Sequence, residues 1–225
     1  AIGSFVAAKL TTGAHNVFIG KTAADDMVEG SYNIAIGSDA LGGAKDSTAD
    51  SSQHNTFIGV NSGNGAWVTA VSQYNVAVGN YTLDGAMNGA TSNVAVGYQA
   101  LSAITTGDAN VSLGSEAGES IDTGAYNVSI GYQSNEAITS GQYNITIGAF
   151  ALETATTALK NIMIGGGAGQ NITAGVAVNG AIGIGYGAFS GTGTQTTDIN
   201  HTIAIGTNTL ANLESGIGNV AIGFE

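Results

Sequence analysis

A short motif that ends in glycine recurs through the whole chain and constrains its fold more than any other feature. Asn93 to Gly97 reads Asn-Val-Ala-Val-Gly, and near-copies of it recur from one end to the other. The closing glycines are Gly3, Gly20, Gly37, Gly59, Gly79, Gly97, Gly114, Gly131, Gly148, Gly165, Gly185, Gly206 and Gly223. Seven of the twelve spacings between them are 17 residues, and the others are 18, 20, 20, 21 and 22. Such a period predicts a solenoid, in which each repeat forms one coil and packs on its neighbours.

Each repeat contains a predicted strand directly before its closing glycine. Apolar, mostly β-branched residues stand three positions and one position before the glycine, as in Val94 and Val96. Two such positions separated by one residue are the period-2 signature of a strand with one buried face. The residue between them is usually small, as in Ala95, and points the other way. We therefore expect the Val and Ile rows to face the core, and the small residues to form an outer face suited to oligomerisation.

A second, less regular strand is expected after the closing glycine. Leu101 and Ile104 represent two apolar slots that recur in this part of the repeat. Glycine on both sides and β-branched Thr leave too few residues for a helix. A second turn, where a positive φ is expected, is marked by Gly107, Gly124, Gly141, Gly175 and Gly216. Each coil is thus predicted to have two short strands and two tight turns.

Asparagine and aromatic residues recur at the corner before the first strand. Asn occupies this corner in ten of the twelve complete copies, and Asn side chains in such a position can stack their amides in a ladder. The preceding slot holds Tyr or His in several copies, which predicts a stacked aromatic ladder. An alternative is that His15, His54 and His201 bind a metal or an anion at a threefold axis. The predicted turn and ladder residues are Asn93, Gly97, Asn110, Gly114, Asn127, Gly131, Asn144 and Gly148.

Composition excludes several classes of function. The formal net charge is −12, from 16 acidic and 4 basic residues, which argues against the cationic surface that nucleic-acid binding needs. The chain has no Cys, which excludes disulfides and thiolate zinc sites. No apolar run is long enough to cross a membrane. We therefore expect no nucleic-acid partner, no membrane insertion and no cofactor.

Acidic residues recur in one slot of three successive coils, at Glu119, Glu136 and Glu153. Stacked carboxylates repel, so they either extend into water or share a cation such as Ca²⁺. We expect the solvated stripe. Paired acids can also hydrolyse glycosides, but nothing in the sequence marks a pair such as Glu116 and Glu119 as buried. We therefore expect no catalytic residue, no metal site and no enzymatic activity.

The longer coils carry their extra residues after the predicted second strand, and in repeat proteins such insertions form loops on one face. Trp67, the single Trp, lies in one of them and is placed to stack on a sugar or a surface receptor. The alternative is that its ring folds back on the coil. Candidate receptor-contact residues in these loops are Lys45, Asp46, Asp50, Trp67, Thr69, Gln195 and Asp198.

The repeat resembles that of trimeric phage tail fibres over essentially the whole chain. The resemblance rests on Asn93-Val-Ala-Val-Gly-Tyr-Gln-Ala-Leu101, on Thr105-Thr-Gly107 and on Asn127-Val-Ser-Ile-Gly-Tyr-Gln133. The strand motif alone is also similar to the head repeats of trimeric autotransporter adhesins, whose period is shorter. Both resemblances imply a left-handed parallel β-roll and a homotrimer.

Together these observations predict an all-β chain, a parallel β-roll or β-solenoid of about 12 coils. We expect residues 1–225 to form a single repeat array, cut mid-repeat at both ends and part of a longer fibre protein. The resemblance implies a structural and adhesive component of a phage tail fibre, located in the virion, that spaces or presents the binding of a host receptor. Its implied partners are further copies of itself, other tail proteins and a host surface glycan. The alternatives are the head of a bacterial adhesin on the cell surface and, more weakly, a polysaccharide-degrading tailspike.

Overall fold

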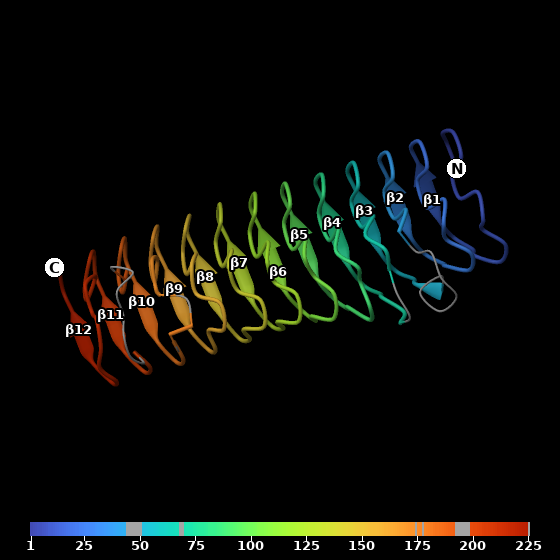
Figure 1. Cartoon of the computed structure of the whole chain (residues 1–225). Coiled ribbons are helices and arrows are strands. Elements are labelled where there is room, and N and C mark those ends of the chain that lie inside the picture. The colour runs from blue at the N-terminus through green and yellow to red at the C-terminus, as the bar shows by residue number, and fades with distance from the viewer. Residues whose placement is uncertain (44–50, 68–69, 174, 177, 192–198, 225) are drawn as a thin grey trace. The chain divides into compact units, whose positions relative to one another are not determined.

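The structure is a computed structural model that describes residues 1–43, 51–67, 70–173, 175–176, 178–191 and 199–224. Within these ranges the chain is all-β and contains no helix. Its strands are β1 (Val17–Ile19), β2 (Ile34–Ile36), β3 (Thr56–Ile58), β4 (Val76–Val78), β5 (Val94–Val96), β6 (Val111–Leu113), β7 (Val128–Ile130), β8 (Ile145–Ile147), β9 (Ile162–Ile164), β10 (Ile182–Ile184), β11 (Ile203–Ile205) and β12 (Val220–Ile222). Each coil contributes one strand (Figure 1). The predicted parallel β-solenoid with a repeat of about 17 residues is confirmed.

The coils belong to two compact units, Ala1–Asn110 and Val111–Glu225. Strands β1 to β5 pair in chain order in the first unit, and β6 to β12 do so in the second, all in parallel. The register places equal positions of the repeat opposite each other, as for Val76 with Val94 and Val128 with Ile145. Each slot of the repeat therefore becomes a row of like side chains within its unit.

The strands bury the small middle residue and expose the branched residues on either side, which is the reverse of the orientation predicted above. Ala95 is 0 % exposed, whereas Val78 and Ile147 are 38 % and 36 % exposed. The middle residue is buried in every strand from β1 to β11. The physical reason is space, because each coil is narrow and its interior accepts little volume from the strand.

The remainder of the repeat supplies the large core side chains. In two recurring slots, residues of 0–1 % exposure fill the interior, namely Leu41, Leu83, Leu101, Leu152, Ile104, Ile121, Ile138 and Ile172. These apolar slots were recognised in the sequence. The Val and Ile rows of the strands are not part of this core, so each coil is closed by Leu, Ile and Ala from its turns.

The inward strand residue and the residue six positions later share one space. Where the strand carries Ala77 or Ala95, the later residue is Leu. Where the strand carries Phe57, the later residue is Gly63, and a Cβ there would lie 2.6 Å from the Phe57 ring. Where it carries Met163, the later residue is Gly169, and a Cβ there would lie 3.0 Å from the Met163 sulfur. A large residue at one position requires a small one at the other, as close packing demands.

The second part of the coil is a run of turns and bends, so the expected second strand is wrong. Only isolated bridges occur there within the described ranges, such as the one between Gln142 and Leu159. Non-glycine residues adopt left-handed backbone conformations in this part, for example Gln99 with φ 54° and Leu101 with φ 50°. A segment that contains left-handed residues such as these cannot remain extended.

The glycines of the second turn serve close packing more often than a special backbone conformation. Gly175 and Gly216 have the expected positive φ, at 84° and 119°, but Gly107, Gly124 and Gly141 do not. A Cβ on Gly124 would lie 2.5 Å from the carbonyl oxygen of Gly141 in the next coil. The corner therefore needs a residue without a side chain, because the coils approach each other closely there.

Buried Asn side chains form a ladder at the corner before the strands. The backbone N and the Nδ2 of Asn93 both donate to Oδ1 of Asn75, at 3.0 and 3.2 Å, and Nδ2 also donates to the carbonyl of Gly107 at 2.9 Å. Asn110 repeats the first two contacts onto Asn93. The buried Asn residues of this corner are Asn33, Asn55, Asn75, Asn93 and Asn110 in the first unit and Asn127, Asn144 and Asn161 in the second.

Removal of one amide from this ladder is expected to be costly. Asn93→Ala leaves the backbone N of Asn110 and the carbonyl of Gly107 without the partners they have now. Each unpaired buried group costs about 1–3 kcal/mol, so we expect a loss of about 3 kcal/mol in the free energy of unfolding. Urea unfolding followed by circular dichroism measures it. The control Asn212→Ala changes an exposed Asn and should shift stability by less than about 0.5 kcal/mol; equal effects of the two variants would contradict a stabilising ladder.

Candidate functional site

The outward faces of the strands carry two rows of partly exposed apolar side chains, which we call the apolar strand rows. In the first unit they consist of Val17, Ile34, Thr56, Val76 and Val94 and of Ile19, Ile36, Ile58, Val78 and Val96. In the second unit they consist of Val111, Val128, Ile145, Ile162, Ile182, Ile203 and Val220 and of Leu113, Ile130, Ile147, Ile164, Ile184, Ile205 and Ile222. Soluble proteins rarely expose long contiguous apolar surfaces unless these bind something.

An aromatic ladder lies at the corner that precedes the Asn residues. The rings of Tyr32 and His54 stack with centroids 4.9 Å apart and planes 2° apart, and His15 and Tyr74 extend the stack on either side. In the second unit, Tyr126 and Tyr143 stack at 5.0 Å. The stacked ladder predicted for this slot is therefore present. The His residues alternate with Tyr in the first unit, and among the described residues no group of three or more His, Asp or Glu could hold a metal ion.

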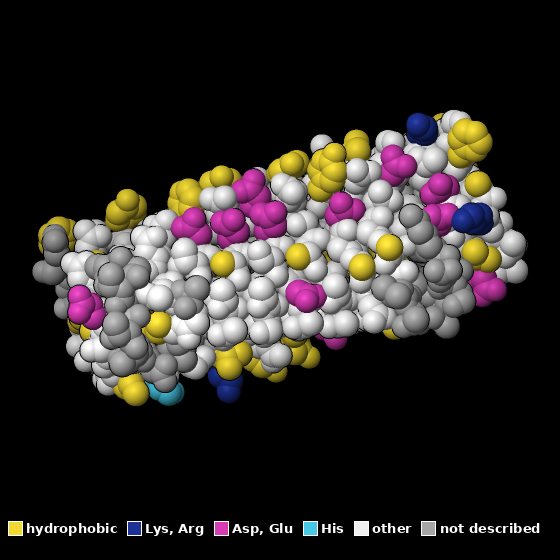
Figure 2. Space-filling model, viewed as in Figure 1, with side chains coloured by type: hydrophobic (Ala, Val, Ile, Leu, Met, Phe, Trp, Pro, Cys, Tyr) yellow, Lys and Arg dark blue, Asp and Glu magenta, His cyan; other side chains and the backbone are white. Residues whose placement is uncertain are grey.

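An acidic stripe crosses consecutive coils of the second unit, formed by Glu116, Glu119, Glu136 and Glu153. Figure 2 shows acidic side chains gathered over the coils of β6 to β9, next to hydrophobic ones. All four are partly exposed. An amide of the following coil hydrogen-bonds to the stripe without removing its charge, since Gln133 Nε2 donates to Glu116 at 2.8 Å.

Burial and mutual repulsion raise the pKa of two carboxyls in this stripe. Burial is the larger cause for both; at Glu119 the charge of Glu116 adds to it, and at Glu136 the charges of Glu153, Glu119 and Glu116 do. Between the ordinary and the raised pKa the folded chain therefore binds more protons than the unfolded chain. Its stability falls as the pH rises through that interval.

Neutralisation of Glu136 is expected to stabilise the fold at neutral pH. Glu136→Gln removes a charge repelled by its neighbours, so the melting temperature should rise at about pH 7 and should not rise at about pH 3.5, where the Glu136 carboxyl with its raised pKa is protonated. The gain should stay below about 1 kcal/mol, the scale of exposed charge pairs. Thermal unfolding at both pH values measures it. Glu214→Gln removes the same charge from an exposed site outside the stripe; an equal gain there would contradict repulsion within the stripe.

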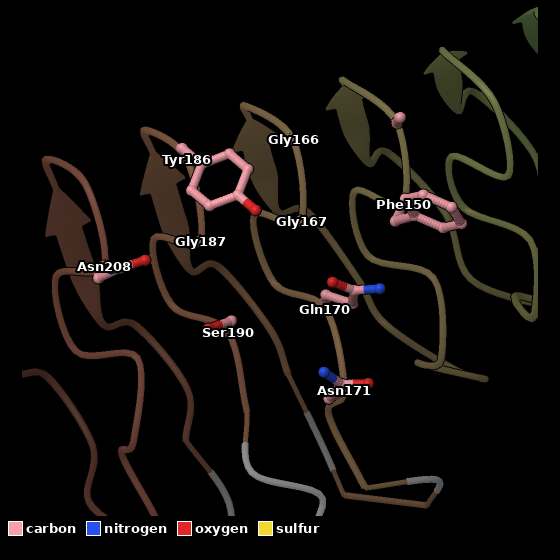
Figure 3. A pocket seen from close by; sticks show the side chains of 10 residues that line it. Phe150, Gly166, Gly167, Gln170, Asn171, Tyr186, Gly187, Ser190 and Asn208 are labelled. Atoms are coloured by element: carbon pink, nitrogen blue, oxygen red, sulfur yellow. The ribbon is translucent and has the colours of Figure 1, made fainter.

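A groove opens in the second unit where one coil lacks side chains that its neighbours have. The first two residues after the closing glycine are Gly166 and Gly167 in this coil, whereas the neighbouring coils place Phe150 and Tyr186 there. The groove has a volume of about 400 Å³. Figure 3 shows Phe150 on one side of it and Tyr186 on the other. Its polar lining consists of Gln170, Asn171, Ser190 and Asn208.

The polar groups of the groove are held in defined positions. Gln170 Nε2 donates to the carboxylate of Glu153 at 2.6 Å, which leaves its Oε1 beside Gly167, where a Cβ would lie 3.0 Å from that oxygen. The Oδ1 of Asn208 lies beside Gly187 in the same way, 2.4 Å from where a Cβ would stand. Sequence reasoning missed this groove, although the Gly166-Gly167 pair in a slot of larger residues was a signal that could have found it.

Of the loop residues predicted to contact a receptor, only Trp67 lies within the described residues. Its ring is 2 % exposed and packs edge-on against Phe57, with centroids 5.6 Å apart. The ring lies inside its coil and is not accessible for stacking on a sugar. The other predicted contact residues lie outside the described residues, namely Lys45, Asp46, Asp50, Thr69, Gln195 and Asp198.

Comparisons with known proteins identify no family for this chain. No family model matches it, and no curated protein or solved structure does so. In the part of the chain that the structure describes, no helix has the length and apolar character needed to span a membrane. The function is therefore inferred from the residues and geometry of the chain itself.

Proposed function

We propose that this chain is a structural and adhesive element, a homotrimeric β-roll shaft of a phage tail fibre that spaces or presents the binding of a host receptor. The apolar strand rows are the observation that carries this proposal. In this proposal the chain has no enzymatic activity and needs no cofactor. The tail-fibre assignment and the number three come from the resemblance of the repeat motifs.

Burial of the apolar strand rows between copies of the chain supplies the driving force for assembly. Val78, Ile147 and Ile184 keep 38 %, 36 % and 37 % of their surface exposed in the single chain. Each Å² of apolar surface removed from water contributes about 25 cal/mol, and the same contact repeats in every coil. Copies of one chain present identical rows, and a closed cyclic homo-oligomer places the same surfaces of every copy at its interfaces.

The surface used for assembly differs from the one expected from the sequence. The small residues expected to contact other copies lie inside the coils, so only the Val and Ile rows remain on the strand face. Polar residues at the interface are few, because the strand face offers Thr56 as the single hydrophilic member of these rows. The contact is therefore of the apolar kind found in obligate oligomers.

A mass measurement in solution tests the assembly. Light scattering should give about 67 kDa, three times the mass of one 22.2 kDa chain. A stable mass near that of a single chain would overturn the trimeric shaft.

A charge placed in the apolar strand rows should dissociate the trimer without unfolding the coil. Ile147→Asp puts a carboxylate at an outward position that is 36 % exposed in the single chain and is covered on assembly, so the mass should fall to that of one chain while the circular dichroism spectrum is retained. Ser140→Asp is the control, since Ser140 is an exposed residue outside the strand of the same coil, and it should leave the mass unchanged. A trimer that tolerates Ile147→Asp would show that the copies do not meet through these rows.

A further inference from the structure

We infer that the groove between Phe150 and Tyr186 is a binding subsite for a neutral glycan, with a sugar ring held between the two aromatic side chains. This inference rests on the adhesive part of the proposed function and names a site and a ligand class for it. Three features of the groove carry the inference: its size, its aromatic walls and its uncharged polar lining.

The groove has the size of a small-ligand site, and its presence follows from the residues of one coil. Its volume of about 400 Å³ falls in the range of pockets that bind small molecules. It exists because Gly166 and Gly167 have no side chains, whereas Tyr186 occupies the first of these positions in the following coil and Phe150 the second in the preceding coil. Gly167 has a φ of 65°, and the same slot of the preceding coil holds Phe150 with a φ of 60°, so the backbone there accepts a large side chain and the groove results from the residue type in this slot.

The walls present flat apolar surfaces. Tyr186 is 70 % exposed, and its ring lies against Gly166, where a Cβ would be 3.4 Å from the ring carbon Cδ2. Phe150 is held from behind by Tyr132, whose ring meets it edge-on at 5.3 Å and 87°. A pyranose ring has an apolar face of C–H groups and an edge of hydroxyls, and aromatic side chains with a few placed polar groups form the kind of pocket that binds such amphipathic ligands.

The lining offers hydrogen-bonding groups that suit hydroxyls. Within the described part of the chain, the side chains of Asn171, Ser190 and Asn208 make no hydrogen bond, and Gln170 keeps its Oε1 as an acceptor because Glu153 takes its Nε2. Amides and a serine hydroxyl can both donate and accept. Figure 3 shows Gln170 and Asn171 below the two aromatic side chains, with Ser190 and Asn208 on the side of Tyr186.

The charges of the groove and of the chain favour neutral sugars over acidic ones as ligands. No charged side chain lines the groove, and Gln170 in its lining is bound to the carboxylate of Glu153. The chain carries a net charge of −12. An anionic sugar or a phosphate would be repelled here and would find no cation. The ligand class is therefore a neutral oligosaccharide of hexoses or N-acetylhexosamines.

A glycan-binding assay with two groove variants tests the site. The probes are immobilised neutral tri- and tetrasaccharides of glucose, galactose and N-acetylglucosamine, with sialylated trisaccharides as the acidic comparison, and the full chain is applied in its assembled state. Tyr186→Ala removes one wall. Gly166→Val fills the groove with the residue that Val60 supplies at the same slot of another coil. Each variant should bind its preferred neutral glycan at least about tenfold more weakly.

The control is Tyr98→Ala, which removes a tyrosine of the same slot, 47 % exposed, from a coil that does not line this groove. It should bind as the unchanged chain does, and all variants should retain the melting temperature and oligomer mass of that chain. Loss of binding in both groove variants, with binding retained in Tyr98→Ala, supports the site. Neutral-glycan binding that survives both variants would overturn the groove and leave the adhesive function standing. Binding of none of the neutral probes, or of sialylated probes only, would overturn the ligand class, while the solution mass separately decides the trimeric shaft.

Discussion

The narrow interior of the coil is the constraint on which the rest of this structure depends. One strand of three residues and a run of turns enclose a space so small that a single large side chain fills it. The strand and the turn that follows must share that space, which is why Phe57 faces Gly63 and Ala95 is followed by Leu101. Because the interior is filled from the turns, the branched residues of the strand have no room inside and remain on the outer face.

The same constraint explains how buried polar groups are satisfied. A thin coil brings the backbone of its corners into the interior, where unpaired donors and acceptors are costly. The Asn ladder answers this cost, because each amide bonds to the neighbouring Asn and to a carbonyl of the adjoining coil, as Asn144 does with Asn127 and Ala158. The close approach that makes these bonds possible also excludes side chains at Gly124 and Gly141. Packing and polar satisfaction are thus two consequences of one geometry.

The sequence predicts the features of this fold that depend on repetition, and it misleads where they depend on volume. The solenoid, the aromatic stack at Tyr32 and His54 and the apolar slots of Leu101 and Ile104 follow from residues that recur at one position. The orientation of the strand could not be taken from period 2 alone, because alternation is symmetric and does not say which face is inward. The pairing of Phe57 with Gly63 and of Met163 with Gly169 contained that information, but only in comparison across coils.

The features of the candidate site divide in the same way, into those that recur in the repeat and those that depart from it. The acidic stripe was visible as a recurring slot, whereas the groove beside Tyr186 arises from a departure from the repeat and depends on what three neighbouring coils carry. The second strand was expected because Thr and Ile favour extended structure. It does not form, because residues such as Gln99 and Leu101 adopt left-handed conformations that curl the chain back within a few residues.

The Asn ladder keeps one geometry across coils of different length. The hydrogen bond from the backbone N to the preceding Oδ1 is 3.0 Å across separations of 22, 20 and 18 residues, from Asn33 to Asn93, and 2.9 Å across 17 residues, between Asn93 and Asn110. Insertions are therefore absorbed outside the ladder, and doubling the length of a flexible loop costs only about 0.6 kcal/mol in closure entropy. Coils of this kind can be duplicated, exchanged or lengthened by recombination without disturbing their neighbours. The array can thereby acquire new surface loops while the packing between its coils stays unchanged.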